Sequence, residues 1–326
     1  MDPVITDYLS KLELGESQQF KNMGIIPLFA PIDHTPKYLT LKEALENKLL
    51  TVKEVDQGGS VPELKVVNKA EIAVLLLDGE EVVGAKQNRV LNTTILLRKK
   101  SETIIPVSCT EQGRWSYVSE EFSDSDVTIS PKIRMRKAAS VSESLEQSDS
   151  FESDQSAVWN EINEMSAQAA VLSPTGAMRD VFESRTKDLD EYLKAFKYVP
   201  HQKGMLVFID GEIIGFDIIS LESAYEALHP KLVKSYAMDA ILQKKGKSSK
   251  PLLDKARTFL EEVASSREKR YNSVGHGWDY RFEGKASVGS ALVYRKKVIH
   301  MAFFRATKSD KVGEMSGPGR RRGFRT

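Results

Sequence analysis

The stretch that decides the fold is LLLDGEEVVGAKQNRVLNTTILL, residues 75–97. The run from Ile72 to Leu77 is apolar at every position, which predicts a strand buried on both faces and central in its sheet. Asp78-Gly79 follows, and Asp-Gly between two β-forming segments favours a two-residue hairpin turn into a second strand, Glu80 to Gly84. A further strand is expected from Val90 to Leu97, which is rich in Leu, Ile and Thr.

Four polar side chains, Lys86, Gln87, Asn88 and Arg89, stand between these apolar strands. If the backbone is extended, they alternate between the two faces. They could form a binding edge, with Lys86 or Arg89 holding a phosphate or carboxylate while the amides supply directed hydrogen bonds. They could equally be an exposed loop whose amides cap the strand ends. The spacing does not decide between these interpretations.

A second polar run, TEQGRW, occupies residues 110–115 and follows a predicted strand at Thr103 to Val107. Glu111 could act as a base, Arg114 could pair with phosphate, and Trp115 could stack on a ring. The alternative is a salt-bridged arginine packed on a tryptophan at a strand end.

The chain has one cysteine, Cys109, which excludes an internal disulfide and a cysteine-based metal cluster and fits a reducing compartment. Ile105, Val107 and Cys109 share one strand face, so the thiol is expected to point into the core as a small hydrophobe. A nucleophilic thiol would need a lowered pKa, and no histidine lies nearby in the sequence to lower it.

The second half of the chain resembles the first in pattern. Leu206 to Ile209, then Asp210-Gly211, then Glu212 to Phe216 predicts another hairpin, which is either a duplicated unit or a coincidence. Asp217 after it is either a counterpart of the first site or an acid at a strand end. Other features complete the prediction: a capping box at Thr40 and Glu43, helices at 157–170 and 177–196, a break or kink at Pro230, and strands at 50–55, 63–67, 287–294 and 298–304.

These elements predict an α+β fold, mainly antiparallel strands and hairpins in two halves, with several helices in the second half. Residues 119–156 include seven serines and five acids between Ser140 and Ser156, and are expected to be a polar linker or exposed loop. The predicted organisation is a strand-rich half at 1–118, this linker, a helix-plus-hairpin half at 157–305 that could pack with the first as one domain, and a disordered basic tail at 306–326.

Composition restricts function only weakly. The 326 residues carry 47 Lys and Arg against 46 Asp and Glu, a net charge of +1, with 40% hydrophobic residues, as in an ordinary soluble protein. The N-terminus lacks the pattern of a secretory signal and no stretch is long and apolar enough for a membrane span, so we expect a cytoplasmic protein without membrane contact. HExxH, CxxC and GxSxG motifs are absent, and the five histidines show no ligand spacing, so neither a metal site nor a cofactor is expected.

A weaker feature is GHGWDYR, residues 275–281, in which His276 lies between glycines. Flanking glycines expose such a side chain and let a ligand approach the backbone. An ordinary turn explains the same pattern.

The two polar motifs resemble the ADP-ribosylglycohydrolase- and rhodanese-phosphatase-associated domain family. Four later stretches match the same family: DQSAVWNEI, SPTGAMRDVFE, GMLVFIDGEIIGFDII and LVKSYAMDAI. The resemblance covers roughly Gly15 to Phe304. It implies an intracellular domain linked to enzymes that process ADP-ribose, NAD-derived or RNA-linked groups, without an assigned reaction. The residues it brings into consideration are Asp78, Glu80, Lys86, Gln87, Asn88, Arg89, Glu111, Gln112, Arg114 and Trp115.

Three functions follow as hypotheses. The first is binding of a phosphate-bearing ligand, a nucleotide, ADP-ribose or an ADP-ribosylated substrate, with Arg89 and Arg114 on phosphate, Trp115 stacking, and Glu80 or Glu111 as general base. The second is a non-catalytic interaction module that docks onto a partner enzyme. The third is weak RNA contact by the C-terminal tail through Arg320, Arg321, Arg322 and Arg325.

Overall fold

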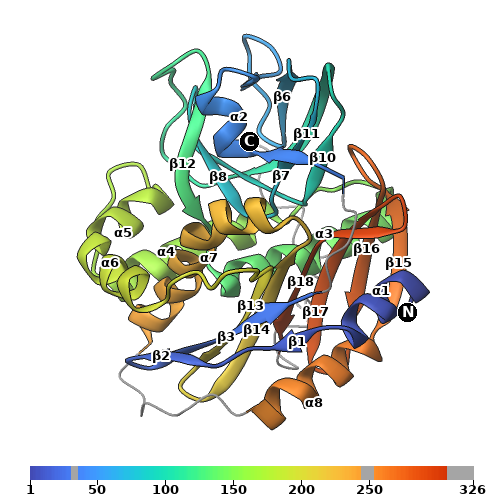
Figure 1. The fold of residues 1–326 in the computed structure, drawn as a ribbon. Helices are drawn as coiled ribbons and strands as arrows, with labels where there is room; N and C mark the ends of the chain where they lie inside the picture. Colours follow the sequence, from blue (N-terminus) through green and yellow to red (C-terminus); the bar gives the residue numbers. More distant parts are fainter. Residues whose placement is uncertain (31–35, 244–252, 307–326) are drawn as a thin grey trace.

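The computed structural model describes residues 1–30, 36–243 and 253–306, and shows an α+β fold whose sheets are mostly antiparallel (Figure 1). The helices are α1 (Pro3–Ser10), α2 (Leu41–Glu46), α3 (Pro131–Ser148), α4 (Gln155–Ala169), α5 (Met178–Ser184), α6 (Thr186–Ala195), α7 (Glu222–Leu242) and α8 (Leu253–Ala264). The strands are β1 (Glu13–Leu14), β2 (Gln18–Phe20), β3 (Met23–Phe29), β4 (Tyr38–Thr40), β5 (Leu50–Glu54), β6 (Glu63–Asn68), β7 (Ala73–Leu76), β8 (Glu80–Gly84), β9 (Arg89–Leu91), β10 (Ile95–Leu97), β11 (Ser101–Cys109), β12 (Phe122–Thr128), β13 (Gly204–Ile209), β14 (Glu212–Ile219), β15 (Arg267–Asn272), β16 (Trp278–Glu283), β17 (Ser287–Tyr294) and β18 (Lys297–Arg305).

Two sheets form the upper part of the molecule in Figure 1. Within the described residues, six strands pair in the order β12-β8-β9-β11-β6-β5 and three in the order β10-β7-β4. Their inner faces enclose a cluster of buried Val, Leu and Ile side chains. Strand β7 is the middle strand of its sheet and almost wholly buried, which confirms the prediction for Ile72 to Leu77. The predicted capping box is also present, since Thr40 accepts from the backbone of Glu43 at the start of α2.

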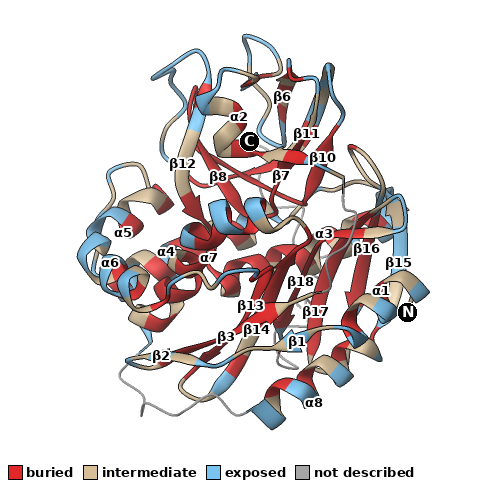
Figure 2. Cartoon of the chain, in the orientation of Figure 1, coloured by how far each residue is buried: buried red, intermediate tan, exposed pale blue. Residues whose placement is uncertain are grey.

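The lower part is a nine-stranded sheet of the described residues, in the order β1-β3-β13-β14-β18-β17-β16-β15, with β2 paired to β3. Helices α1 and α8 pack on one face, and α3, α6 and α7 on the other (Figures 1 and 2). Strand β3 comes from the start of the chain and pairs with β13, with Ile26 opposite Leu206. The sheets therefore do not follow the predicted boundary at residue 118.

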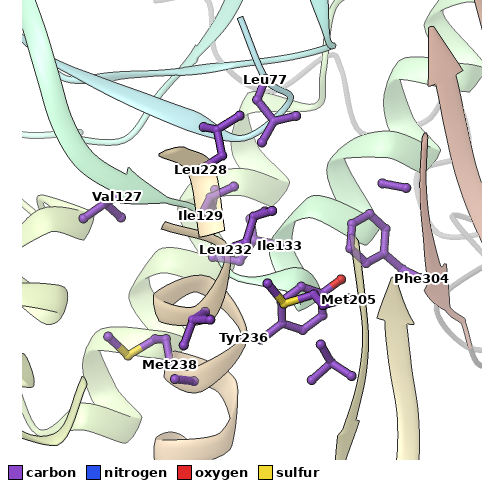
Figure 3. Packing of buried hydrophobic residues seen from close by; sticks show 14 of the residues in the cluster. Leu77, Val127, Ile129, Ile133, Met205, Leu228, Leu232, Tyr236, Met238 and Phe304 are labelled. Carbon is purple, nitrogen blue, oxygen red and sulfur yellow. The ribbon is translucent and has the colours of Figure 1, made fainter. Parts of the chain in front are cut away.

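Helices α3 and α7 lie between the upper and lower sheets. Figure 3 shows Ile133 of α3 and Leu232 of α7 packed with Leu77 from the upper part and Met205 and Phe304 from the lower sheet. All of these side chains belong to one continuous buried cluster. The two halves of the molecule thus share a core.

The polar linker predicted over 119–156 is wrong in most of its length, because these residues form β12 and α3. Helix α3 buries Arg134, Ala138, Val141 and Leu145, which recur at i, i+4, i+7 and i+11 and so lie on one face. The serines and acids occupy the remaining positions. The stripe is not evident in the sequence because its first member, Arg134, is charged, and in the structure this charge is buried against the Asp217 carboxylate.

Two predicted turns also differ. Asp78-Gly79 does not close a hairpin, because β7 and β8 belong to different sheets, whereas Asp210-Gly211 joins the paired strands β13 and β14 with positive φ at both positions. Gly79 alone has positive φ in the first turn, so the chain is redirected from one sheet to the next. Helix α7 runs through Pro230 without ending.

Candidate ligand-binding groove

The two polar segments singled out in the sequence lie against each other. Strand β9 pairs with β11, placing Arg89 opposite Cys109, and the segments that flank this pair continue the contact. Thr110 N–H donates to Asn88 O at 3.0 Å, and Gln87 Nε2 donates to Glu111 O at 3.0 Å. The segments at 84–89 and 110–115 therefore form one polar unit.

Arg114 holds this unit together. Its guanidinium donates five hydrogen bonds, to Ala85 O, Ser116 O, Gly84 O, Asn88 Oδ1 and Glu111 Oε2, the last at 2.6 Å. Glu111 is equally engaged, because it also accepts from Asn88 N–H and from Thr175 Oγ1. Burial acts to raise the pKa of Glu111, but the hydrogen bonds from Arg114 and Thr175 lower it below its ordinary value. Arg114 and Glu111 thus join the two segments, and both carboxylate oxygens of Glu111 already accept hydrogen bonds.

Lys86 lies between two exposed aromatic rings. Its Nζ is 5.2 Å from the ring centroid of Trp115 and 5.1 Å from that of Tyr117, close enough for cation–π attraction. The ammonium also donates to Gln57 O at 2.8 Å and to Gly58 O. Trp115 is 48% exposed and Tyr117 is 50% exposed, so both rings offer surface to a ligand. Of the alternative for this motif, a salt-bridged arginine packed on a tryptophan, the salt bridge is made by Arg114 with Glu111, whereas the arginine over the Trp115 ring is Arg89, at 5.7 Å.

Arg89 is fully buried and only partly hydrogen-bonded. Its Nη1 donates to Gln87 Oε1 at 2.9 Å, while Nε and Nη2 have no partner among the described residues. Glu54 is in the same situation: Oε1 accepts from Lys86 N–H at 3.3 Å, and Oε2 is buried without a described partner. Burial lowers the pKa of Arg89, partly offset by Cys109 and Glu54. Buried polar atoms are almost always satisfied by protein, water or ligand, so these atoms call for a partner.

A groove opens beside these side chains. One wall is formed by residues 53–57 and the other by residues 117–120, so that Glu54 and Tyr117 face the same space. Gly59 lies beside Glu54 and Trp115 with φ of +75°, and a Cβ there would lie 3.4 Å from Glu54 Oε2 and 3.5 Å from Trp115 Cζ2. A larger residue would be strained at this φ and would crowd the groove. Gln112, also predicted as a ligand contact, is exposed and is not among the residues that line the groove.

Asp78 lies elsewhere, in a buried ionic cluster between the upper and lower sheets. It pairs with Lys137 and Arg134 of α3, and Arg134 makes two bonds of 2.9 and 2.7 Å to Asp217. Tyr236 donates to the same carboxylate at 2.8 Å. These side chains are buried and pair with one another, so the cluster has a structural role in connecting the upper and lower sheets.

Glu80 belongs to a second buried pair. It accepts from Lys231 Nζ at 2.7 Å and from Leu77 N–H at 2.8 Å, and Lys231 also contacts Asp124 at 2.6 Å. Burial, opposed by Lys231, raises the pKa of Glu80. The carboxyl has no exposed surface and does not line the groove.

Cys109 is buried as predicted, but among polar groups. It lies opposite Arg89, and its Sγ accepts from Glu111 N–H at 3.3 Å. Val107 and Leu91, the preceding pair on the same strands, belong to the upper core, whereas Cys109 is in none of the hydrophobic clusters of the described residues. Burial raises the pKa of the thiol, so the thiolate is disfavoured.

Comparison with known proteins identifies one relationship. A family model described as the ARG and Rhodanese-Phosphatase-superfamily-associated Protein domain matches residues 11–304. No curated protein and no solved structure matches the chain significantly. Across residues 1–30, 36–243 and 253–306, no helix combines the length and apolar character needed to span a membrane. Residues 307–326, which include nearly all of the predicted tail, lie outside the described residues.

Proposed function

The chain belongs to the ARG and Rhodanese-Phosphatase-superfamily-associated domain family, and from this premise we propose that its groove binds a phosphate-bearing ligand of the nucleotide or ADP-ribose kind. The observation that carries the proposal is Arg89, a buried arginine with two N–H groups of its guanidinium left unpartnered beside an exposed tryptophan. The family name links the domain to ADP-ribosylglycohydrolases and to rhodanese-phosphatase proteins, which favours this ligand class.

The groups in and beside the groove match the parts of such a ligand: Glu54 and Tyr117 line it, and Lys86, Arg89 and Trp115 lie next to them. Lys86 and Arg89 supply positive charge for phosphate, and an arginine can donate two parallel hydrogen bonds to one phosphate. The Trp115 and Tyr117 rings offer faces on which a base can stack. The free oxygen of Glu54 can accept from a ribose hydroxyl, as acidic residues do in dinucleotide sites. Arg114 and Glu111 position the two segments and do not contact the ligand.

Isothermal titration calorimetry with ADP-ribose, NAD and inorganic phosphate tests the proposal. Because stacking of a base on an aromatic ring contributes about 1–3 kcal/mol, Trp115→Ala should weaken nucleotide binding by about 5- to 150-fold. Trp278→Ala is the matched control, since Trp278 is 41% exposed and also carries a cation, Arg270, at 4.4 Å. Lys86→Met should weaken all three ligands by removing charge while keeping the aliphatic stem.

No heat with any of the three ligands, from a sample whose circular dichroism shows a folded protein, contradicts the proposal. Equal losses in Trp115→Ala and Trp278→Ala would contradict the assignment of the groove.

A second function is favoured by one observation. Trp115, Tyr117 and Val118 form a short exposed apolar segment, and Val118 is 67% exposed. Exposed apolar surface of this kind often marks a protein-binding site. In this alternative, the same segment docks a partner enzyme of the ADP-ribosylglycohydrolase or rhodanese-phosphatase class. Val118→Asp should then abolish co-elution with such an enzyme in size-exclusion chromatography, and unchanged co-elution would contradict this alternative.

A further inference from the structure

Two identical tripeptides, Arg-Lys-Lys, occur at residues 98–100 and 295–297. The first follows β10 and leads into β11, and the second forms the turn between β17 and β18. Of the six side chains, all but Lys297 are exposed, and Lys297 is half-buried. Lys100 pairs with Glu71, at 3.2 Å on the surface. Arg98, Lys99, Arg295 and Lys296 place four exposed cations here, in a chain whose net charge is only +1.

The two tripeptides meet at His276. His276 N–H donates to Leu96 O at 2.7 Å, which ties this loop to the strand before the first tripeptide. On the other side, the His276 ring stacks on Tyr294 with centroids 4.5 Å apart, and Arg295 lies 5.1 Å from the Tyr294 ring. Figure 1 shows the ends of β16 and β17 beneath the sheet that contains β10.

The glycines that flank His276 permit this close packing. A Cβ at Gly275 would lie 2.3 Å from Leu96 O, and one at Gly277 would lie 2.3 Å from Val293 O. Burial lowers the pKa of His276, and the charges of Arg98 and Arg295 lower it further. Both guanidinium groups therefore act on the same ring, and the tripeptides form one basic surface.

The backbone of the second tripeptide is unfavourable for its residues. Arg295 and Lys296 have φ of +51° and +59°, the left-handed region required at both centres of a type I′ turn. Asn-Gly adopts this conformation at least cost, and the chain uses Asp-Gly for the comparable turn at residues 210–211. Two long cations at the tip are thus retained despite the backbone, a cost that is often tolerated where a site needs the side chains.

We propose that the two Arg-Lys-Lys turns and His276 form a binding surface for single-stranded nucleic acid, with the cations on phosphates and the stacked His276–Tyr294 rings beside the bases. Cations interleaved with aromatic rings are the usual composition of such surfaces. The surface lies at the Ser101 end of β11, whereas the polar unit beside the groove lies at its Cys109 end. It is separate from the proposed ligand site and from the C-terminal arginines.

Fluorescence anisotropy with a labelled 12-nucleotide oligouridylate, at 50 to 200 mM KCl, tests the proposal on the full chain. The informative variant is Arg295→Asn combined with Lys296→Gly, which removes two charges while making the turn more favourable. We expect at least 5-fold weaker binding at 100 mM KCl. The slope of log K against log salt should be shallower by about 1.4, because each phosphate contact on a single strand contributes about 0.7.

The matched control is Lys194→Gln with Lys197→Gln, which removes two exposed charges at the distant end of α6 and should leave binding unchanged. The melting temperature of the Asn-Gly variant should equal or exceed that of the wild type, so that weaker binding cannot be attributed to misfolding. Arg98→Gln should also weaken binding, because it acts on the other tripeptide. Unchanged binding in both patch variants, as the C-terminal arginines alone would produce, overturns the proposal. Equal binding of a glutamate peptide of the same charge overturns it as well.

Discussion

Asp217 shows how much a single buried charge contributes here. Its carboxylate accepts two hydrogen bonds from Arg134 and one from Tyr236, and His300 Nε2 lies 3.3 Å away. Although burial acts to raise its pKa, Arg134 and His300 hold the pKa of Asp217 well below the usual range. Asp217→Asn should destabilise the protein by about 3–5 kcal/mol, because the buried Arg134 would lose its two-fold ion pair and keep only the longer contact with Asp78. Urea unfolding measures the change in the free energy of unfolding, and Asp190→Asn, at an exposed position, is the control. A decrease below about 1 kcal/mol would contradict a stabilising role for the buried ionic cluster.

Glu81 predicts a dependence of stability on pH. Burial raises the pKa of this carboxyl to about 7, despite a hydrogen bond from Thr110 Oγ1, and Oε2 has no partner among the described residues. Since the folded pKa exceeds the unfolded one, Glu81 favours folding below about pH 4.5 and loses that contribution as the pH rises to about 7. The loss is about 3 kcal/mol, because one unit of pKa corresponds to about 1.4 kcal/mol.

Glu81→Gln keeps the acceptor for Thr110 and cannot ionise. In urea titrations at pH 5, 6, 7 and 8, its stability should fall less than that of the wild type between pH 5 and 7. Parallel curves for the two proteins would show that Glu81 does not titrate in this range.

For single residues, the sequence predicted some contacts of the candidate site and not others. It brought together the segments at Lys86–Arg89 and Glu111–Trp115, because both flank predicted strands, and the structure places them in one unit. It could not separate Asp78 and Glu80 from that unit, since their partners, Lys137 and Lys231, lie far along the chain. It also missed Glu54, whose position in the groove depends on how β5 ends beside Lys86.

Among the elements, α3 departs most from its sequence pattern. Its polar residues suggested a linker, yet Leu145 is only 3% exposed and packs in the helix's buried stripe. Leu145→Ala should therefore cost about 2–5 kcal/mol of unfolding free energy, as for other large-to-small core changes. The neighbouring exposed Gln147→Ala is the control. If both substitutions leave the melting temperature unchanged, Leu145 is not packed in the core and the prediction is wrong.

The strands were predicted better than the turns between them. Apolar β-forming runs such as β7 and β13 identify themselves locally, because each is buried on both faces. Whether an Asp-Gly pair closes a hairpin depends on which sheet the next strand joins. At Asp78 the buried contacts with Lys137 and Arg134 accompany a change of sheet, and these contacts are not visible in the local sequence.

For the whole molecule, the shared core between the sheets predicts a single unfolding transition. Leu77, Val127 and Ile129 from the upper part pack in the same cluster as Met205 and Phe304 from the lower sheet. Two single-tryptophan variants can report on each part, one retaining Trp115 and the other Trp278, with the remaining tryptophans replaced by phenylalanine. Their urea midpoints should coincide, as two-state unfolding requires. Midpoints separated beyond error would mean that the parts unfold independently.

The pairing of β3 with β13 has a consequence for synthesis of the chain. Strand β3, MGIIPLF, is buried in the finished sheet, but its partner at Gly204–Ile209 is translated much later. At about 5–20 residues per second, an apolar segment emerges from the ribosome about ten seconds or more before the strand that covers it. During that interval β3 is a natural binding segment for a chaperone, and slower translation would prolong its exposure to aggregation.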